Sequence, residues 1–266
     1  MTPRRRIAPS AVVWLLLGAA YFTIPLIATL IYSFRSDQTG TCCTLANYDY
    51  IVSDAEFWRT IKLSFVVALE TIAVTLVLLV PTVYWVHLKV PRLRPLIGFL
   101  ALVPFVVAPI ILVVGLLDAY RWTPQWFYGE PYGFLVAAYV IVSFPYMYFS
   151  LDNGFRSIDV HTLTEASQSL GASWPTTLWR VILPNIRAAA LAGSFLTLAI
   201  VMGEYTIASL AQFNVFSVYV QYINQNKAYP AAAVTLLAFG ITWAAMLALA
   251  LAGRGRRTAP VAEGAR

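Results

Sequence analysis

The chain has 266 residues, of which 60% are hydrophobic and only 11% are charged, and its formal net charge is +6. Its mean hydropathy of +0.72 excludes an ordinary soluble domain and indicates a protein embedded in a membrane. The basic residues are spread over the connections between apolar runs, a pattern of membrane topology that argues against nucleic-acid binding.

Six apolar runs are long enough to cross a bilayer, because a helix needs about 20 residues to span ~30 Å of hydrocarbon. In chain order they cover about 11–33, 61–86, 95–117, 132–151, 188–210 and 230–252. A barrel would show short alternating segments instead. The sequence therefore predicts an all-α, polytopic membrane protein with six transmembrane helices, in which Pro25, Pro81, Pro104 and Pro109 introduce kinks.

The organisation predicted along the chain is one membrane domain with two short tails. Residues 1–10 form the first tail, 11–252 the six-helix domain and 253–266 a basic, Gly/Ala-rich tail. The first apolar run follows Arg4 to Arg6 but is longer than the apolar core of a signal peptide, so we expect an uncleaved first span. Cys42 and Cys43 fall in the first outer loop, and the sequence leaves their redox state open.

Orientation follows from the Lys and Arg residues of the loops, because the cytoplasmic side retains them. With the N-terminus inside, thirteen basic residues lie on the inner side and five, namely Arg35, Arg59, Lys62, Arg121 and Lys227, on the outer side. Both termini and the loop at about 152–187 are therefore predicted to be cytoplasmic.

That inner loop reads as two short amphipathic helices. Asp159 is a suitable cap for the first, Leu163, Ala166 and Leu170 recur at helical spacing, and Gly171 suits a left-handed stop. The second begins at Ser173, presents Trp174, Leu178 and Val181 on one face, and is expected to end at Leu183-Pro184. Such helices either dock in a groove of a partner or lie in the membrane interface, and periodicity alone does not decide between the two.

The residues of this loop resemble a known family motif. Glu165-Ala166-Ser167, Gly171 and Val181-Ile182-Leu183-Pro184 are similar to the EAA loop of the membrane permease subunits of type I ABC importers, with matching spacing. The chain departs from that pattern at Ser167, at Val181 and at Ala188. Leu45-Ala46-Asn47-Tyr48 and Phe57-Trp58 also resemble the opening of such subunits. Gly203-Glu204-Tyr205 is similar to the fifth helix of the polyamine branch, which has relatives for iron(III), thiamine and phosphonates.

The resemblance implies a partner assembly in a bacterial inner membrane. Two permeases, the second of them expected to be a different chain, would pair above two ABC ATPases, each of which receives one loop helix. A solute-binding protein would deliver the substrate from outside. The chain has no G-x-x-x-x-G-K-[ST] segment, so ATP and Mg²⁺ are expected on the partner ATPase and no cofactor on this chain. By resemblance, Glu165 makes a charge contact, Ala166 allows close approach and Gly171 makes the bend, with Ser167, Leu183 and Pro184 completing the ATPase-coupling segment.

Acidic residues inside the apolar runs are the second functional signal. Glu70 and Glu204 lie in the second and fifth predicted spans, where a charge costs at least ~2.5 kcal/mol and marks a polar path or a partner. With Asp118 and Tyr205 they are candidates for the path of a small cationic solute. The structural alternative is that the two glutamates tie helices together and that aromatic residues such as Tyr205 form an interfacial belt.

Catalysis is not indicated, because His87 and His161 are too few for a metal cluster and no nucleophilic triad converges. The rival from another class is a proton-coupled secondary transporter that uses Glu70 and Glu204 as a relay, although no inverted repeat is visible. The sequence therefore predicts a non-enzymatic permease subunit of an ABC importer, for a polyamine or another small cation.

Overall fold

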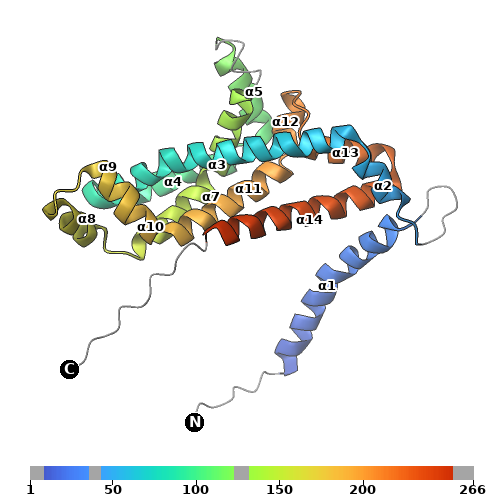
Figure 1. The fold of residues 1–266 in the computed structure, drawn as a ribbon, viewed down its shortest axis with the longest axis horizontal. Coiled ribbons are helices and arrows are strands. Elements are labelled where there is room, and N and C mark those ends of the chain that lie inside the picture. Colours follow the sequence, from blue (N-terminus) through green and yellow to red (C-terminus); the bar gives the residue numbers. More distant parts are fainter. Residues whose placement is uncertain (1–8, 36–42, 123–131, 254–266) are drawn as a thin grey trace. The chain divides into compact units, whose positions relative to one another are not determined.

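The computed structural model describes residues 9–35, 43–122 and 132–253, and those residues form helices joined by short connections (Figure 1). The predicted all-α fold is confirmed for this part of the chain. Cys42, the first eight residues and residues 254–266 lie outside it. The chain divides into two compact units, residues 59–218 with 242–266 and residues 1–58 with 219–241.

The larger unit is built around α3 (Ala55–Lys89), α4 (Arg94–Val106), α7 (Gly133–Arg156) and α11 (Arg187–Gly203). Its core joins α3, α7 and the loop that follows α7 through Tyr84, Met147, Leu151, Phe155, Leu178 and Ile182. Gly193 lets α7 and α11 pack closely, because a Cβ there would lie only 3.3 Å from the Met147 Cα. Small residues serve this purpose in membrane bundles, where burial from water does not drive helices together.

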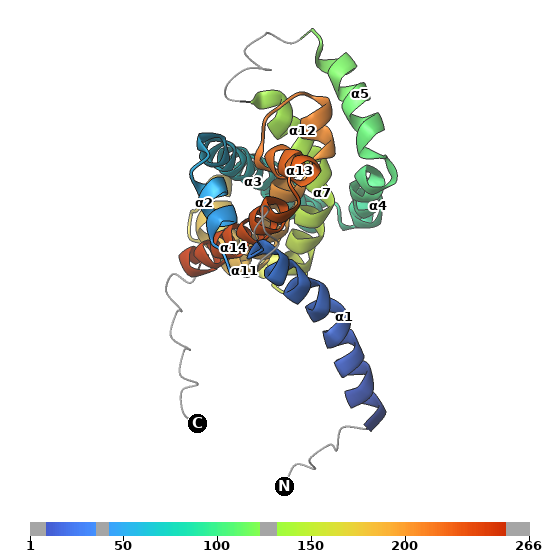
Figure 2. The ribbon, with the colours of Figure 1, turned by 90° about the vertical axis from the view of Figure 1, so that its right-hand side faces the viewer.

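The third predicted span is not one helix. A short 3₁₀ turn, η1 (Pro91–Leu93), leads into α4, and α5 (Pro109–Tyr120) follows after a bend of 100° (Figures 1 and 2). Val107 and Ala108 are extended at the bend. Pro109 explains it, because proline disfavours helical geometry in the preceding residue and has no N–H for the helix ladder. The kink predicted at Pro109 is therefore a complete break.

The loop between α7 and α11 (residues 157–186, called the α7–α11 loop below) is helical along most of its length. It contains α8 (Val160–Ser169), α9 (Trp174–Thr176), the π-helical stretch η2 (Thr177–Ile182) and α10 (Leu183–Asn185). Two predicted boundaries were wrong. The α7 helix continues to Arg156, so the loop does not begin near 152, and helical structure passes through Pro184 to Asn185. Proline is tolerated there because it occupies the first turn of α10.

The fifth predicted span, 188–210, is also interrupted. The α11 helix ends at Gly203, and α12 (Thr206–Leu210) begins after Glu204 and Tyr205. Glu204 is extended, with φ −75° and ψ 115°. The chain then forms α13 (Phe216–Asn226) and α14 (Ala228–Gly253), each of which has residues in both units.

The smaller unit contains α1 (Pro9–Ser33), α2 (Ala46–Val52) and the first part of α14. Asn47 fastens α2 to the end of α1, because its Nδ2 donates to the carbonyl oxygens of Ser33 and Arg35 at 2.8 and 2.7 Å. The Tyr48 hydroxyl lies 2.8 Å from Ser33 Oγ. The Asn47-Tyr48 pair that carried part of the family resemblance thus holds the start of α2 against the end of α1.

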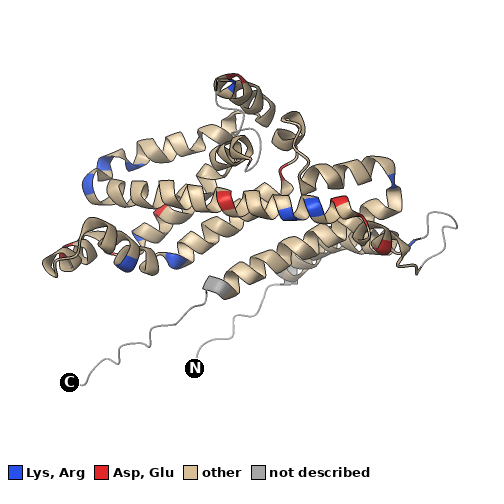
Figure 3. Ribbon diagram, turned by 45° about the horizontal axis from the view of Figure 1, so that its top comes forward, with Lys and Arg blue, Asp and Glu red and all other residues tan. Residues whose placement is uncertain are grey.

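Helices long and apolar enough to cross a membrane are Val12–Ser33, Ala55–Lys89, Gly133–Arg156 and Ala228–Leu251 among the described residues. Two bent pairs, Pro91–Val106 with Pro109–Tyr120 and Trp174–Asn185 with Arg187–Gly203, raise the number from 4 to 6 if each is one span. The predicted count of six holds only on that condition. Figure 3 shows long uncharged stretches in these helices, as a lipid environment requires.

Candidate functional site

The α7–α11 loop begins with a capped helix. Asp159 is the N-cap of α8, and its carboxylate accepts from the Thr162 N–H at 3.1 Å and from the Thr162 hydroxyl at 2.7 Å. These bonds hold the pKa of Asp159 below its ordinary value, with the Thr162 hydroxyl the larger cause. The cap therefore stays charged at neutral pH and is lost only as the pH falls through that lowered pKa. The capping role predicted for Asp159 is present in the structure.

Gly171 ends α8 in the left-handed conformation, with φ +82°. The Gly171 N–H donates to the Gln168 carbonyl at 2.8 Å, and the Ala172 N–H donates to the Ser167 carbonyl at 3.1 Å. This pair of bonds is the Schellman arrangement, in which glycine is favoured because it has no Cβ. The structure thus contains the stop expected at Gly171.

The two faces of α8 differ in what they contact. Val160, Thr164 and Ser167 are buried, whereas Glu165 and Ala166 are exposed, and Leu170 is 89% exposed. Leu163 is half-buried between the two faces. The exposed face therefore combines a carboxylate, a small residue and a large apolar residue. Within the described residues, the Glu165 side chain has no hydrogen bond or ion pair.

The buried face of α8 is fixed by hydroxyl groups. Tyr84 OH of α3 lies 3.0 Å from Thr164 Oγ1, and Ser167 Oγ lies 2.7 Å from Thr177 Oγ1 of η2. The Tyr84 ring also contacts the Trp174 ring, with centroids 6.2 Å apart. Ser167 thus lies between the two helical parts of the loop, and the α8 surface is tied to the long helix α3.

The second part of the loop faces inward more than its sequence pattern suggested. Of the predicted stripe, Trp174 is 41% exposed and Val181 is half-buried, but Leu178 is only 1% exposed and belongs to the core of the larger unit. Leu183 packs against that core, and Pro184 is exposed. Leu178 is therefore not available to a partner.

Glu204 lies where α11 is interrupted. Its carboxylate oxygens accept from the Ile207 N–H at 3.1 and 2.9 Å, so the side chain caps α12. Its backbone carbonyl accepts from Ser217 Oγ at 2.6 Å and from the Tyr139 hydroxyl at 3.4 Å. The interruption is therefore stabilised by both the side chain and the backbone of Glu204, and Tyr205 beside it is 39% exposed.

The other two acidic candidates have different surroundings. Glu70 on α3 is half-buried, and within the described residues its carboxylate has no hydrogen bond or ion pair. Asp118 on α5 is exposed and forms an ion pair with Arg121 at 3.3 Å. Within the part of the chain that the structure describes, no hydrogen bond or ion pair joins Glu70, Asp118 and Glu204 to one another, although α5 does contact α12.

One charged cluster was missed from the sequence. Asp152 of α7 is 3% exposed; its Oδ1 lies 2.7 Å from His87 Nε2 and 3.4 Å from Arg94 Nη2, and its Oδ2 accepts from Arg156 Nε at 2.8 Å. The loop predicted at about 152–187 would begin at Asp152, whereas this residue lies within α7. The Asp152/Arg156 spacing of four residues was the one available signal, since such pairs meet on a helix.

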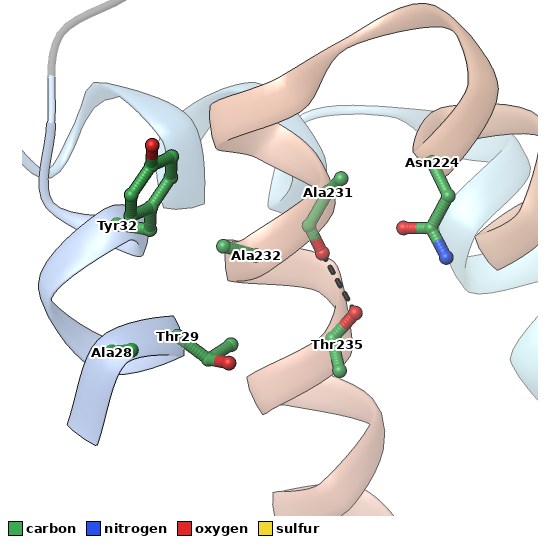
Figure 4. A pocket seen from close by; sticks show the side chains of 7 residues that line it. All are labelled: Ala28, Thr29, Tyr32, Asn224, Ala231, Ala232 and Thr235. Atoms are coloured by element: carbon green, nitrogen blue, oxygen red, sulfur yellow. Dashed lines mark hydrogen bonds between the residues drawn. The ribbon is translucent and has the colours of Figure 1, made fainter. Parts of the chain in front are cut away.

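The smaller unit has a small groove of its own. Its volume is about 340 Å³, and Figure 4 shows it lined by Ala28, Thr29, Tyr32, Asn224, Ala231, Ala232 and Thr235. None of these side chains is charged, and none was a candidate from the sequence. The candidate site therefore consists of the exposed α8 face and the interruption at Glu204.

Solved structures of ABC transporters share this fold. A bacterial ABC transporter involved in the import of the acidic polysaccharide alginate matches with a TM-score of 0.62 and 15% sequence identity, over 96% of this chain and 100% of the matched chain. An amino acid ABC transporter, solved with histidines, matches with a TM-score of 0.53 and 16% identity, over 80% of this chain and 99% of the other. At these identities the likeness concerns the fold alone.

A curated relative is the probable ABC transporter permease protein y4fN of Sinorhizobium fredii (strain NBRC 101917 / NGR234). It is 26% identical over an alignment of 221 residues, and the match covers 78% of this chain but only 38% of the relative. The chain thus spans about two-fifths of the length of that protein.

A family model settles the relationship. Residues 91–254 match the binding-protein-dependent transport system inner membrane component, a match that covers more than half of the chain. This match confirms the permease resemblance drawn from the loop residues, and it agrees with the prediction that the chain is not itself an enzyme. The chain belongs to the family of inner membrane components of binding-protein-dependent transport systems.

Proposed function

We propose that this chain is a permease subunit of an ATP-driven ABC importer and that the α7–α11 loop receives the movement of a partner ATPase. The observation that carries the proposal is the exposed face of α8, where Glu165, Ala166 and Leu170 lie beside the Gly171 stop. A short helix whose exposed face combines a carboxylate, a small residue and a large apolar residue suits a groove on a partner.

The proposed mechanism depends on the rigidity of this loop. When two ATPases close on ATP, each moves as a rigid body, and a helix seated on one of them moves with it. The Tyr84–Thr164 contact ties α8 to α3, and the Ser167–Thr177 contact ties α8 to η2, which leads into α11. A displacement of α8 would therefore move α3 and α11 together. Their movement would change the side of the membrane to which the transport path is open.

The partners follow from the family and from the chain itself. ATP and Mg²⁺ are proposed on separate ATPase subunits, because the sequence contains no phosphate-binding loop. A second permease, in our proposal a different chain, would complete the path, and a solute-binding protein would deliver the substrate. The proposed location is the inner membrane, with the α7–α11 loop and both termini in the cytoplasm.

For the substrate we propose a small cation, such as a polyamine. Glu204 and Asp118 already have partners in Ile207 and Arg121, whereas the half-buried Glu70 has none among the described residues. A carboxylate in an apolar helix attracts a cation more strongly than it would in water. Glu70 is thus the strongest acidic candidate for binding the cation. In this proposal Glu204 contributes a second carboxylate at the helix interruption, and the exposed Tyr205 ring contributes a cation–π contact.

The test is reconstitution of the chain with its ATPase, second permease and binding protein in vesicles, followed by uptake of labelled spermidine. Uptake should require ATP and should continue after a protonophore collapses the proton gradient, because ATPase closure supplies the energy. Uptake by this chain alone, driven by a proton gradient, would identify a secondary transporter and overturn the proposal. ATP-driven uptake of a different solute would retain the permease and reject only the cation.

A further inference from the structure

A pocket of about 630 Å³ opens between α4 and α7, in a region that the proposed transport cycle does not use. Its charged end is formed by Arg94, Asp152 and Arg156. Its remaining walls are apolar or aromatic and include Phe99, Leu102, Tyr148 and Phe149. Arg94 is the first residue of α4 and Arg156 the last of α7, so the charges lie at helix ends.

The charged end has more cationic donors than the protein uses. Arg156 directs Nε and Nη2 to Asp152 Oδ2, at 2.8 and 2.6 Å, whereas Arg94 reaches Oδ1 only at 3.4 Å. The Arg94 Nε is buried and has no hydrogen-bond partner. Two guanidinium groups thus face one carboxylate, and a buried N–H without an acceptor is unfavourable unless a ligand satisfies it. This end of the pocket is suited to an anion.

A mostly apolar groove continues from the pocket. A second hollow of about 360 Å³ shares Leu102 and Phe149 with it; its further lining is Phe105, Pro145, Tyr146 and Leu196 together with the polar Ser150 and Asn153. The groove therefore runs from the helix ends, where the arginines lie, along the apolar surfaces of α4 and α7. An anionic group at one end and an extended apolar wall beyond it match the two parts of a phospholipid.

We propose that this groove binds one anionic phospholipid, with the phosphate at Arg94 and Arg156 and an acyl chain along Leu102, Phe105 and Phe149. Guanidinium groups bind phosphate through paired hydrogen bonds. Basic pockets between membrane helices are a known kind of site for acidic headgroups. The lipid supplies the acceptor that Arg94 Nε lacks, and because it spans α4 and α7 it stabilises their packing.

The test measures lipid association of the full chain in vesicles, with spin-labelled phosphatidylglycerol and phosphatidylcholine of the same acyl length as probes. The wild-type protein should immobilise phosphatidylglycerol preferentially. Arg94→Gln removes one cationic donor set and should lower that preference about fivefold. Arg92→Gln is the matched control, because Arg92 is exposed on η1 and does not line the pocket, and it should leave the preference unchanged.

A second variant keeps all charges. A Cβ at Gly98 would lie 3.8 Å from the Tyr148 ring, in ordinary contact, so Gly98→Ala should fold and bind as the wild type does. In Gly98→Leu the longer side chain occupies the pocket and should abolish the preference for phosphatidylglycerol. This variant tests the site independently of Arg94→Gln, and so covers the case in which Arg94→Gln folds poorly.

Three results would overturn the assignment. The first is an equal affinity of the wild-type protein for the two lipids. The second is displacement of phosphatidylglycerol by millimolar inorganic phosphate, which would identify a soluble anion as the ligand. The third is loss of the preference when the second permease assembles, which would identify a protein surface as the occupant.

Discussion

At the scale of single residues, Tyr84 has the most specific part in the proposed coupling. It is fully buried on α3, its hydroxyl lies 3.0 Å from Thr164 Oγ1, and its ring contacts Trp174 and Phe155. Thr164 Oγ1 also donates to the Val160 carbonyl at 2.6 Å, so it keeps one partner if Tyr84 is changed. The hydroxyl can therefore be removed without stranding a buried group on α8.

Tyr84→Phe should loosen α8 while preserving the core. The lost hydrogen bond is worth ~0.5–1.5 kcal/mol, so backbone amides of α8 should exchange with solvent deuterium roughly two to ten times faster. Tyr222→Phe, at a position 62% exposed on α13, is the matched control and should change nothing. Unchanged exchange in α8 of the Tyr84 variant would show that the hydroxyl does not hold this helix.

Glu204 is the residue at which the structural and functional interpretations can be separated. Gln in its place keeps an oxygen for the Ile207 N–H but removes the charge, whereas Ala removes both. An attraction of even ~1 kcal/mol to a passing cation corresponds to about fivefold in rate. Glu204→Gln should therefore assemble normally but lower uptake about fivefold per assembled complex.

The Glu204→Gln variant is compared with Glu204→Ala. The Ala variant should lower uptake and, in addition, reduce the yield of assembled complex, because α12 loses its cap. Asp49→Asn, on the exposed surface of α2, serves as a charge control. Unchanged uptake of a confirmed cationic solute by the Gln variant would remove Glu204 from the path and leave it a capping role.

At the scale of elements, α8 shows how a ten-residue helix acquires a defined surface. It is too short to be stable alone in water. The free backbone groups at its two ends are hydrogen-bonded by the Asp159 cap and by the two backbone bonds around Gly171. Its buried face is hydrogen-bonded to α3 and to η2. The exposed face can therefore be held in one orientation, which a rigid coupling element requires.

Gly171 offers a clean test of that element. No atom lies within 4 Å of a Cβ built there, so a substitution acts through backbone strain alone. Gly171→Val should cost ~1–2 kcal/mol in the left-handed conformation and reduce ATP-driven uptake, whereas Gly171→Asn, which tolerates that conformation, should retain most activity. The two variants are compared by uptake and by the amount of ATPase that co-purifies. Equal and normal values for both would refute the docking role of the loop.

At the scale of the whole molecule, the distribution of charge determines the proposed orientation. Thirteen basic residues fall on the side assigned to the cytoplasm and five on the other. The structure adds that Ser169, in the α7–α11 loop, and Asn226, at the end of α13, are both exposed. Each is thus a suitable position for a chemical probe.

Cysteines at these two positions test the orientation, in a variant with Cys42 and Cys43 replaced by serine. An impermeant thiol reagent added to whole cells should label Asn226→Cys, because that residue is predicted to face outward. It should label Ser169→Cys only after the inner face is opened. Labelling in the opposite order would reverse the proposed topology.

The sequence was sufficient for features that depend on local chemistry. Apolar runs of about 20 residues predicted the membrane helices, Asp159 predicted the cap of α8, and Gly171 predicted its left-handed stop. In each case the residues that determine the structure are neighbours in the chain, so their spacing contains the information. The same local pattern led to the family, which the match over residues 91–254 confirms.

Only the tertiary structure decided which residues meet across the chain. His87 and Asp152 are 65 positions apart and Tyr84 and Thr164 are 80 apart, and no periodicity relates them. The break at Pro109 was equally out of reach, because neighbouring helices can either restore or leave unpaired the backbone groups that a proline frees. The amino-acid sequence by itself thus determined the helices, their caps and the family. The packing of those helices decided where the spans break, which face of α8 is exposed and where buried charges gather, since these depend on contacts between distant segments.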